Sequence, residues 1–284
     1  MNLMRKISKR IHPVSLIKYD IRKNRNGFRK EKQAKKHGDP IECDSIDHIH
    51  IYQTLRCNLK CSFCINRLAV EKIFNYQEEP FSEWSDLINR LHGVRELYFN
   101  GGEHFILHGF GDFINSLDGF NIRIFTNFPK QGAEEFKKLD AKRNNIVLLI
   151  SYHPHTGEPV ANFVKRCNES IPKGILWNPH IIRANGVSTR MYADAFNRFG
   201  IYPTSEELVL PFMNDANIKK VLCKTNEWIL APDMRLYKCM IHMLQGLDNG
   251  NYNYENGFKS SLINCDFYPR CSGCNAYNEI MNSL

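Results

Sequence analysis

The sequence predicts an α/β fold, in which short strands alternate with helices around a parallel sheet. Two observations favour it. Short β-type runs recur between residues 41 and 210, and stretches with helical spacing of apolar residues separate them. A third observation agrees: polar groups, cysteines and glycines follow the strands, as they do where parallel strands end at a site. Such alternation is typical of βαβ units. It leaves open whether the sheet is doubly wound or closed into a barrel.

The individual elements follow from period and composition. Strands are predicted over residues 48–53, 96–100, 121–126, 146–152 and 176–182, with a weaker sixth near Leu208. These runs are short, and residues 49–52 of the first alternate apolar with polar residues, as half-buried strands do. Helices are predicted between them, over residues 81–91, 105–116, 133–142, 160–169 and 189–199. The sequence thus predicts five or six βα units.

Composition limits the class of protein. The 284 residues are 43% hydrophobic and 24% charged, which is typical of a globular protein. No apolar run is long enough to cross a bilayer, and no signal-peptide pattern opens the chain. The ten cysteines fall partly into C-x3-C-x2-C and C-x2-C groups, which indicates metal ligands in a reducing compartment rather than a disulfide framework. A cytoplasmic location is therefore expected.

Positive charge is concentrated at the amino terminus. Residues 1–39 contain 13 Lys or Arg against 3 Asp or Glu, whereas the remainder contains 25 against 27. Met4, Ile7 and Ile11 recur at helical spacing among these basic residues. We treat residues 1–40 as a basic arm, which is either a solvated appendage or a contact for an anionic partner such as a lipid surface, a nucleic acid or an acidic substrate.

Three cysteines, Cys57, Cys61 and Cys64, directly follow the first predicted strand. Three thiolates hold three irons of a cubane iron–sulfur cluster and leave the fourth iron open for another ligand. A closed structural zinc site normally has four protein ligands. The spacing therefore predicts a reactive metal site. The alternatives are a zinc-knuckle fragment or three unrelated core cysteines.

The segment from Cys57 to Cys64, with the aromatic Phe63 before the last cysteine, resembles the signature of the radical S-adenosylmethionine (radical SAM) superfamily. The resemblance implies a partial (β/α)6 barrel over residues 41–210. It also implies a [4Fe–4S] cluster on the three cysteines, with S-adenosylmethionine (SAM) bound to the open iron and Phe63 beside the adenine. An electron from a donor such as flavodoxin or ferredoxin would cleave SAM to a 5′-deoxyadenosyl radical.

Further positions extend the resemblance. Gly101, Gly102 and Glu103 resemble the family's GGE motif, which binds the SAM amino group; the family's following proline is His104 here. The remaining SAM-binding candidates are strand-end residues, Thr126, Asn127 and Ser151. The family usually reads Thr-Asn-Gly at the first place, and Phe128 replaces that glycine. Ordinary turn and strand-end polar residues are the alternative for each. His153 and His155 are expected to be surface histidines, with a role in substrate acid–base chemistry as the alternative.

The last part of the chain, residues 211–284, is rich in cysteine. Residues 223–239 are predicted to form a hairpin around a Pro-Asp turn, which would bring its two end cysteines together. This part resembles the Twitch and SPASM domains of radical SAM maturases, with Met234 in place of a glycine. It is thus a small α+β appendage that would hold an auxiliary [4Fe–4S] cluster, with structural zinc as the alternative. The expected ligands are Cys223, Cys239, Cys271 and Cys274, with Cys265 in reserve; Cys43 and Cys167 are expected to be buried thiols.

The resemblance implies a radical SAM oxidoreductase or maturase that takes hydrogen from a substrate C–H bond. Relatives with such tails act on ribosomal peptides, on enzymes needing a formylglycine and on aminocyclitol alcohols, so a peptide or carbohydrate-like small molecule is the expected substrate. The alternative is a zinc-stabilised protein without catalysis that binds nucleic acid through its basic arm.

Overall fold

The computed structural model describes residues 39–44, 46, 48–61, 64, 66, 78–183, 188–207, 221–223, 228–237, 239, 243, 258–259 and 263–265. The predictions for the basic arm, Phe63, Cys271 and Cys274 lie outside these residues. Within the described part, no helix combines the length and apolar character needed to span a membrane.

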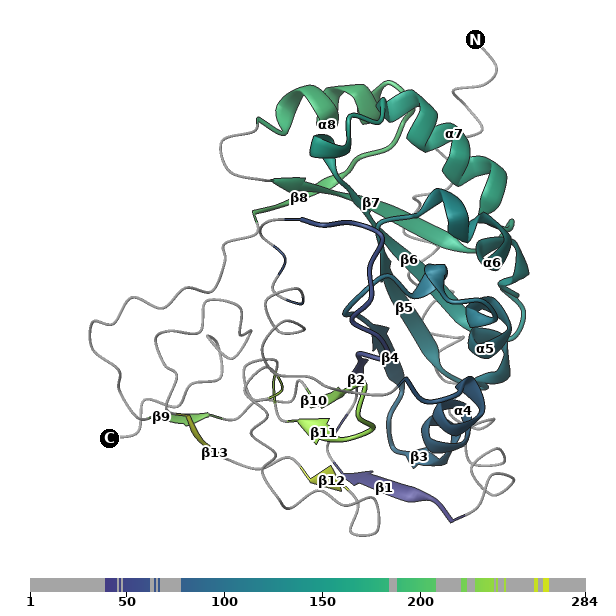
Figure 1. Ribbon diagram of the computed structural model, residues 1–284, viewed down its shortest axis with the longest axis vertical. Helices are drawn as coiled ribbons and strands as arrows, with labels where there is room; N and C mark the ends of the chain where they lie inside the picture. Colours follow the sequence, from purple (N-terminus) through teal and green to yellow (C-terminus); the bar gives the residue numbers. More distant parts are fainter. Residues whose placement is uncertain are drawn as a thin grey trace.

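Eight strands form the main sheet, in the order β11-β10-β2-β4-β5-β6-β7-β8 (Figure 1). Six of them are parallel and neighbour one another in chain order. A doubly wound sheet would reverse its strand order part-way, so this unbroken progression is that of a barrel. Because no ladder joins β8 to β11 among the described residues, the barrel is partial, and the predicted fold class is confirmed. The six strands are β2 (His48–Ile51), β4 (Glu96–Phe99), β5 (Asn121–Thr126), β6 (Asn145–Tyr152), β7 (Leu176–Arg183) and β8 (Thr204–Glu207).

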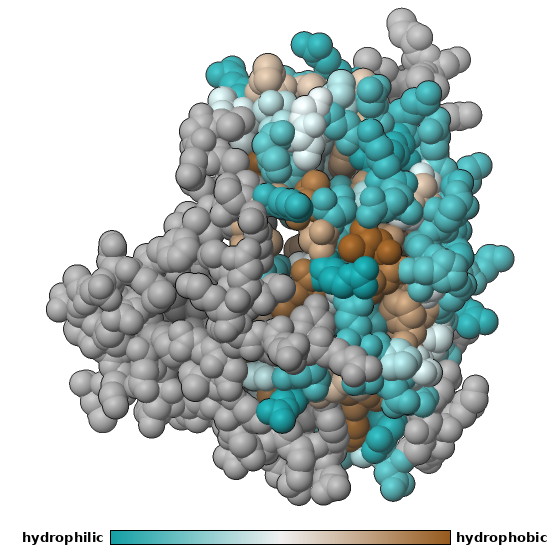
Figure 2. Space-filling view, viewed as in Figure 1, coloured by the Kyte–Doolittle hydropathy of each residue, from teal (hydrophilic) through white to brown (hydrophobic). Residues whose placement is uncertain are grey.

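Helices cover one face of this sheet (Figure 1). Every second residue of β6 is buried, including Ile146, Leu148 and Ile150, because that face packs on the helices. The outer surface of the helices is mainly hydrophilic (Figure 2). The helices are α4 (Phe81–Arg90), α5 (Phe110–Ser116), α6 (Ala133–Lys138), α7 (Val160–Ser170) and α8 (Arg190–Asn197), with short 3-10 turns η2 (His104–Ile106), η3 (Lys130–Gly132) and η4 (Pro154–Thr156).

Several element boundaries differ from the prediction. The helix expected to begin at Phe105 begins at Phe110, because Gly109 has a left-handed φ of 90° and breaks the run after η2. Helix α6 ends at Lys138, since Leu139 adopts a ψ of 128°. The strand expected near Leu208 lies just before it. Two further strands, β1 (Ile41–Asp44) and β3 (Leu91–His92), pair in parallel and were not predicted.

The predicted hairpin near the carboxyl terminus is present, and it belongs to the main sheet. Strand β10 (Trp228–Leu230) pairs antiparallel with β11 (Leu236–Tyr237) and parallel with β2. Trp228 and Leu230 are 0% and 1% exposed and lie in the same core as the barrel residues. The remaining strands are β12 (Phe258–Lys259), which pairs with β1, and β9 (Val221–Cys223), which pairs with β13 (Ile263–Cys265). The sheet therefore crosses the domain boundary predicted at residue 210.

Candidate functional site

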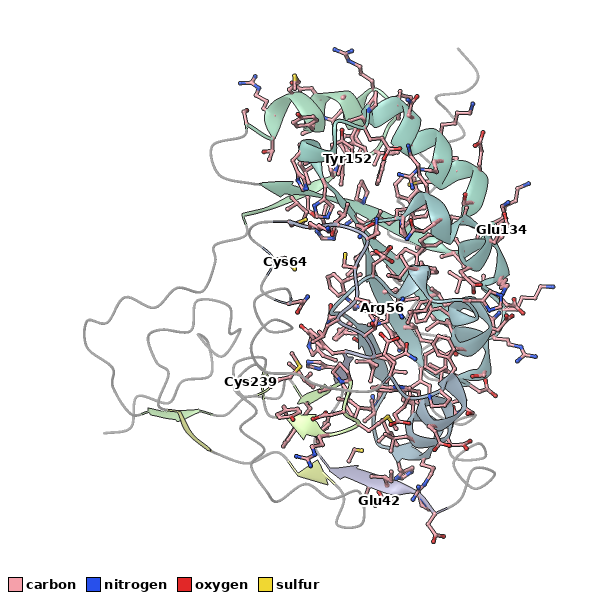
Figure 3. All side chains as sticks on the ribbon, in the orientation of Figure 1. Glu42, Arg56, Cys64, Glu134, Tyr152 and Cys239 are labelled. Atoms are coloured by element: carbon pink, nitrogen blue, oxygen red, sulfur yellow. The ribbon has the colours of Figure 1, made fainter. Side chains whose placement is uncertain are left out.

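The candidate site lies where the loops after β2, β4, β5 and β6 begin. The carboxyl ends of parallel strands meet at one edge of a sheet, so residues from these loops are brought together. In Figure 3, Arg56 and Cys64 lie on the side of the sheet away from helices α5 and α6. The loops carry Cys57, Glu103, Asn127 and His153 to this edge.

The three cysteines of the first loop lie near enough for the charges of Cys57 and Cys64 to act on Cys61. Cys61 is 8% exposed, Cys64 is half-buried and Cys57 is exposed. Burial raises the pKa of Cys61 to about 11, and the nearby thiolates of Cys64 and Cys57 add to the shift. A bound metal centre would reverse this effect, because its positive charge favours thiolates. All three are free thiols.

Cys57 also receives hydrogen bonds that suit a thiolate. The Leu59 amide lies 3.4 Å from its Sγ, and Nδ2 of Asn127 lies 3.5 Å from it. The same Asn127 nitrogen donates to Oδ1 of Asn58 at 2.9 Å. Three thiols on one loop, with N–H donors aimed at one of them, fit an iron–sulfur cluster.

The turn after β4 is bonded to the cysteine loop through its backbone. The Gly102 amide donates to the Thr54 carbonyl and the Glu103 amide to the Arg56 carbonyl, both at 2.8 Å. Gly101 has a φ of 109°, which favours glycine. A Cβ on Gly102 would lie 2.1 Å from the Arg56 carbonyl oxygen. Both glycines are therefore required by the approach of these two segments.

Glu103 is buried beneath the site, at 1% exposure. Its carboxylate accepts from Thr126 Oγ1 at 2.8 Å, from the Asn127 amide at 2.6 Å and from the Phe105 amide at 3.1 Å. Burial raises the pKa of Glu103 to about 7, although these three donors oppose the shift. The carboxylate thus fixes the start of the loop whose Asn127 side chain reaches Cys57. Its predicted contact with SAM stays a prediction.

Three supporting residues were missed by the sequence analysis. Glu78 accepts from Thr54 Oγ1 at 2.5 Å and from Arg56 Nη1 at 2.9 Å. Asn66 donates to the Gly101 carbonyl at 2.6 Å, and Asn58 bonds Asn127 as described above. Only Asn58 lies inside a recognisable motif. The others act across loops and carry no local signal.

The loop after β6 places two histidines beside Cys61. Its Sγ lies 3.6 Å from Nε2 of His155 and 3.9 Å from Nδ1 of His153. His155 is exposed as predicted, whereas His153 is half-buried. Burial lowers the pKa of His153 to about 4, and His155 adds to the shift. Ser151, also from β6, is half-buried and lies opposite His180 in the sheet, so its role stays a prediction.

Known proteins match this chain over most of its length, at low sequence identity. No family model matches it. The GTP 3′,8-cyclase of Sulfurovum sp. (strain NBC37-1) is 22% identical over 268 residues, which cover 81% of this chain and 76% of that protein. The GTP 3′,8-cyclase of Helicobacter pylori (strain HPAG1) is 22% identical over 253 residues, with the same two coverages. The cysteine loop and the glycine turn bonded to it lie together, as the resemblance to the radical SAM superfamily implies, and these relatives support that resemblance.

Solved structures similar to this chain include Streptococcus suis SuiB bound to S-adenosylmethionine, with a TM-score of 0.39 and 13% identity over 81% of this chain and 65% of SuiB. Another is anSMEcpe with bound AdoMet and Kp18Cys peptide, with a TM-score of 0.41 and 15% identity over 81% of this chain and 89% of that one. The chain thus spans just under two thirds of SuiB.

The cysteine-rich tail, residues 211–284, is described only in part. Cys239 is half-buried, and Figure 3 shows it close to β10 and β11. Cys223 ends β9, and Cys265 ends the neighbouring strand β13, with Ile263 opposite Cys223. Cys271 and Cys274 lie outside the described residues, so the auxiliary site stays a prediction. Cys43 and Cys167, at 3% and 0% exposure, are the buried thiols that were predicted.

Two departures from the family's sequence retain a glycine-like backbone. Phe128 and Met234, each in place of a family glycine, are the non-glycine residues with positive φ in the described part of the chain, at 55° and 60°. Phe128 is 1% exposed and packs on Phe136 at a ring distance of 4.2 Å. Its carbonyl accepts from Arg166. Packing and this hydrogen bond therefore hold Phe128 in a conformation that costs about 1–2 kcal/mol.

Restoring the glycine should destabilise this protein. Phe128→Gly removes the backbone strain but also loses a buried aromatic ring, worth about 3–5 kcal/mol. The free energy of unfolding should fall by about 2–4 kcal/mol in urea denaturation. The same change at Met234, which is only partly buried, should have a much smaller effect because the two contributions nearly cancel. An equal loss at both positions would contradict this explanation.

His104, which occupies the family's proline position, should make the stability of the fold more sensitive to acid. It is 0% exposed, it stacks on Phe110 at 5.1 Å, and neither ring nitrogen has a hydrogen-bond partner among the described residues. Burial lowers its pKa from 6.5 to about 3. Between these values the unfolded chain takes up a proton that the folded chain excludes. The contribution of His104 to stability therefore declines as the pH falls through this range, whereas the raised pKa of the neighbouring Glu103 opposes the decline above pH 4.5.

His104→Leu should remove this sensitivity. Unfolding measured from pH 7 to pH 4 should show a smaller loss of stability toward acid than in the unsubstituted protein. At pH 7 the variant should gain about 1–3 kcal/mol, because two unsatisfied buried nitrogens disappear. His108→Leu, the same change at an exposed position, serves as the control. The explanation fails if both variants show the same acid response.

Proposed function

We propose that this radical SAM enzyme holds a [4Fe–4S] cluster on Cys57, Cys61 and Cys64 and reductively cleaves SAM. One observation supports it above the others. Backbone hydrogen bonds tie the glycine turn to the cysteine loop, and Asn127 ties the loop after β5 to Cys57. Three segments separated in sequence thus meet where a cluster and its ligand would have to share a site.

The chain's own residues then have distinct tasks. The backbone of Gly101 and Gly102 sets the distance between the turn and the loop. Glu103 positions Thr126 and Asn127 through the hydrogen bonds described above, and any direct contact with the SAM amino group would add to that task. Phe63 and Ser151 are proposed as further SAM contacts. When bound, the cluster supplies the electron that divides SAM into methionine and a 5′-deoxyadenosyl radical, which takes a hydrogen atom from the substrate.

Anaerobic purification and reconstitution test this function. Iron, sulfide and zinc are counted, and 5′-deoxyadenosine is measured after reduction with dithionite in the presence of SAM. We expect four irons for one cluster, or eight with an auxiliary cluster, and formation of 5′-deoxyadenosine. Cys57→Ser, Cys61→Ser and Cys64→Ser should each reduce it to background. Cys167→Ala, which changes a buried thiol of α7 outside the site, should not.

The same experiment separates the enzyme from its rival. A colourless protein that contains zinc in place of iron, and that leaves SAM intact, would favour the zinc-stabilised nucleic-acid-binding protein. In that case the basic arm, rather than the three cysteines, would be the feature to pursue.

The substrate and the electron partner remain part of the proposal. We propose oxidation or maturation of a peptide or carbohydrate-like small molecule, with an auxiliary [4Fe–4S] cluster in the tail accepting the electron left on the substrate, and flavodoxin or ferredoxin as reductant. Because the curated relatives are named for a reaction of GTP, GTP belongs in the same substrate panel. A substrate is identified by SAM consumption above the substrate-free rate together with a new product. The basic arm is proposed to contact an anionic partner.

A further inference from the structure

We infer that Cys61, His153 and His155 form a second metal site, which binds a single borderline divalent cation such as Zn²⁺ when the cluster is absent. Each residue offers one ligand atom, and these three atoms lie within 4.8 Å of one another. This site differs from the proposed cluster site in its ligands, because it uses two imidazoles and only one of the three thiols.

The distances fit tetrahedral coordination. Zinc binds sulfur at about 2.3 Å and imidazole nitrogen at about 2.0–2.1 Å, so tetrahedral angles separate the two ligand atoms by about 3.6 Å. The Cys61 Sγ lies 3.6 Å from Nε2 of His155 and 3.9 Å from Nδ1 of His153. The two imidazole rings are nearly perpendicular, at 86°, with their centroids 5.3 Å apart, so they do not stack on each other.

The loop that carries the histidines is well fixed. The Thr156 amide and hydroxyl both donate to the His153 carbonyl, at 3.0 and 2.8 Å, which closes the η4 turn. Tyr152, which is 2% exposed, stabilises the loop because its hydroxyl donates to the Glu158 carbonyl. His155 is exposed, so water can take the fourth position. Three protein ligands with one open position are typical of an exchangeable zinc site rather than a closed structural one.

The two metal sites exclude each other because they share Cys61. Binding the cation releases the thiol proton of Cys61 to solvent and transfers no electron. The cluster needs Cys57 and Cys64, whereas the mononuclear site does not use them. The mononuclear site therefore gives the cluster-free protein a way to keep Cys61 coordinated, and it must empty before a cluster forms. Substitution of a ligand that only one site uses therefore removes that site and leaves the other.

The test uses the full chain, stripped of metal under anaerobic conditions and titrated with ¹¹³Cd²⁺ as the probe. The ¹¹³Cd chemical shift depends on how many sulfur ligands the ion has, so a site with one thiolate and two imidazoles resonates apart from any thiolate-rich site in the tail. We expect this resonance in the unsubstituted protein and in Cys57→Ser. It should be lost in Cys61→Ser, His153→Gln and His155→Gln, with at least tenfold weaker binding of Zn²⁺ by competition with a chelator.

Iron counting completes the double comparison. His155→Gln, a change at an exposed residue that should fold normally, is expected to retain a full cluster after reconstitution, whereas Cys57→Ser should lose it. Absence of the mixed-ligand resonance from the unsubstituted protein, or its persistence in both histidine variants, would overturn the inference. Neither result bears on SAM cleavage, so the failure of this inference and the failure of the proposed function are distinguishable.

Discussion

Replacing Gly102 by alanine should abolish cluster binding and SAM cleavage together. The new Cβ would lie 2.1 Å from the Arg56 carbonyl oxygen and 2.7 Å from the Leu55 carbonyl carbon. Both obstacles are backbone atoms, so the cysteine loop must move and lose its hydrogen bonds to the turn. Each 1.4 kcal/mol of lost interaction free energy lowers a rate or a binding constant about tenfold. We expect at least a tenfold fall in both iron content after reconstitution and 5′-deoxyadenosine formation.

Gly174→Ala provides the control for this substitution. Gly174 has a φ of 99° and its added Cβ would meet only the Ala141 Cβ, at 3.4 Å. It should cost about 1–2 kcal/mol of stability through left-handed backbone strain, without touching the site. Full iron content in Gly102→Ala would show that the turn and the loop are not rigidly joined.

Removing residues 211–284 should unfold the barrel rather than merely delete an auxiliary site. The truncation takes away β10, so β2 loses one neighbour and becomes an edge strand. It also removes Trp228 and Leu230 from the core, each worth about 1.5–3 kcal/mol of burial. Together these two side chains account for about 3–6 kcal/mol, which is comparable with the lower end of the stability of a typical domain, about 5–15 kcal/mol. We expect aggregation on expression and no cooperative thermal transition.

A full-length variant with Cys271→Ser and Cys274→Ser separates ligand loss from strand loss. It retains the hairpin, so it should fold and keep the cluster on the first cysteine loop. A truncated protein that melts cooperatively and binds four irons would show that β10 is dispensable.

Regular local patterns made much of the fold predictable. Strand β5 has the predicted bounds, and α7 ends within one residue of its prediction, because alternation and helical spacing persist over enough residues to be read. Strands β1 and β3, of four and two residues, are too short to show a period. They form by pairing with each other and, for β1, with β12, and no local pattern encodes such pairing.

The site could be predicted only where its chemistry is local. The cysteine loop and the glycine turn are contiguous motifs, and the structure joins them. The hydrogen bond between Asn127 and Cys57 spans 70 residues, and the contacts of Cys61 with the two histidines span 92 and 94. Such contacts arise from the order of the strands in the sheet. The burial of Glu103 is likewise a tertiary property, since a carboxylate in a turn is usually exposed.

The adjacent pair Glu103 and His104 determines how protons move when this turn folds. Folding raises the pKa of Glu103 from 4.5 to about 7, and it lowers the pKa of His104 from 6.5 to about 3. Between pH 4.5 and 6.5 the unfolded chain therefore carries an ionised carboxylate beside an imidazolium, whereas the folded chain carries two neutral groups. Over that interval folding transfers one proton from His104 to Glu103, and the pair exchanges almost no protons with the buffer.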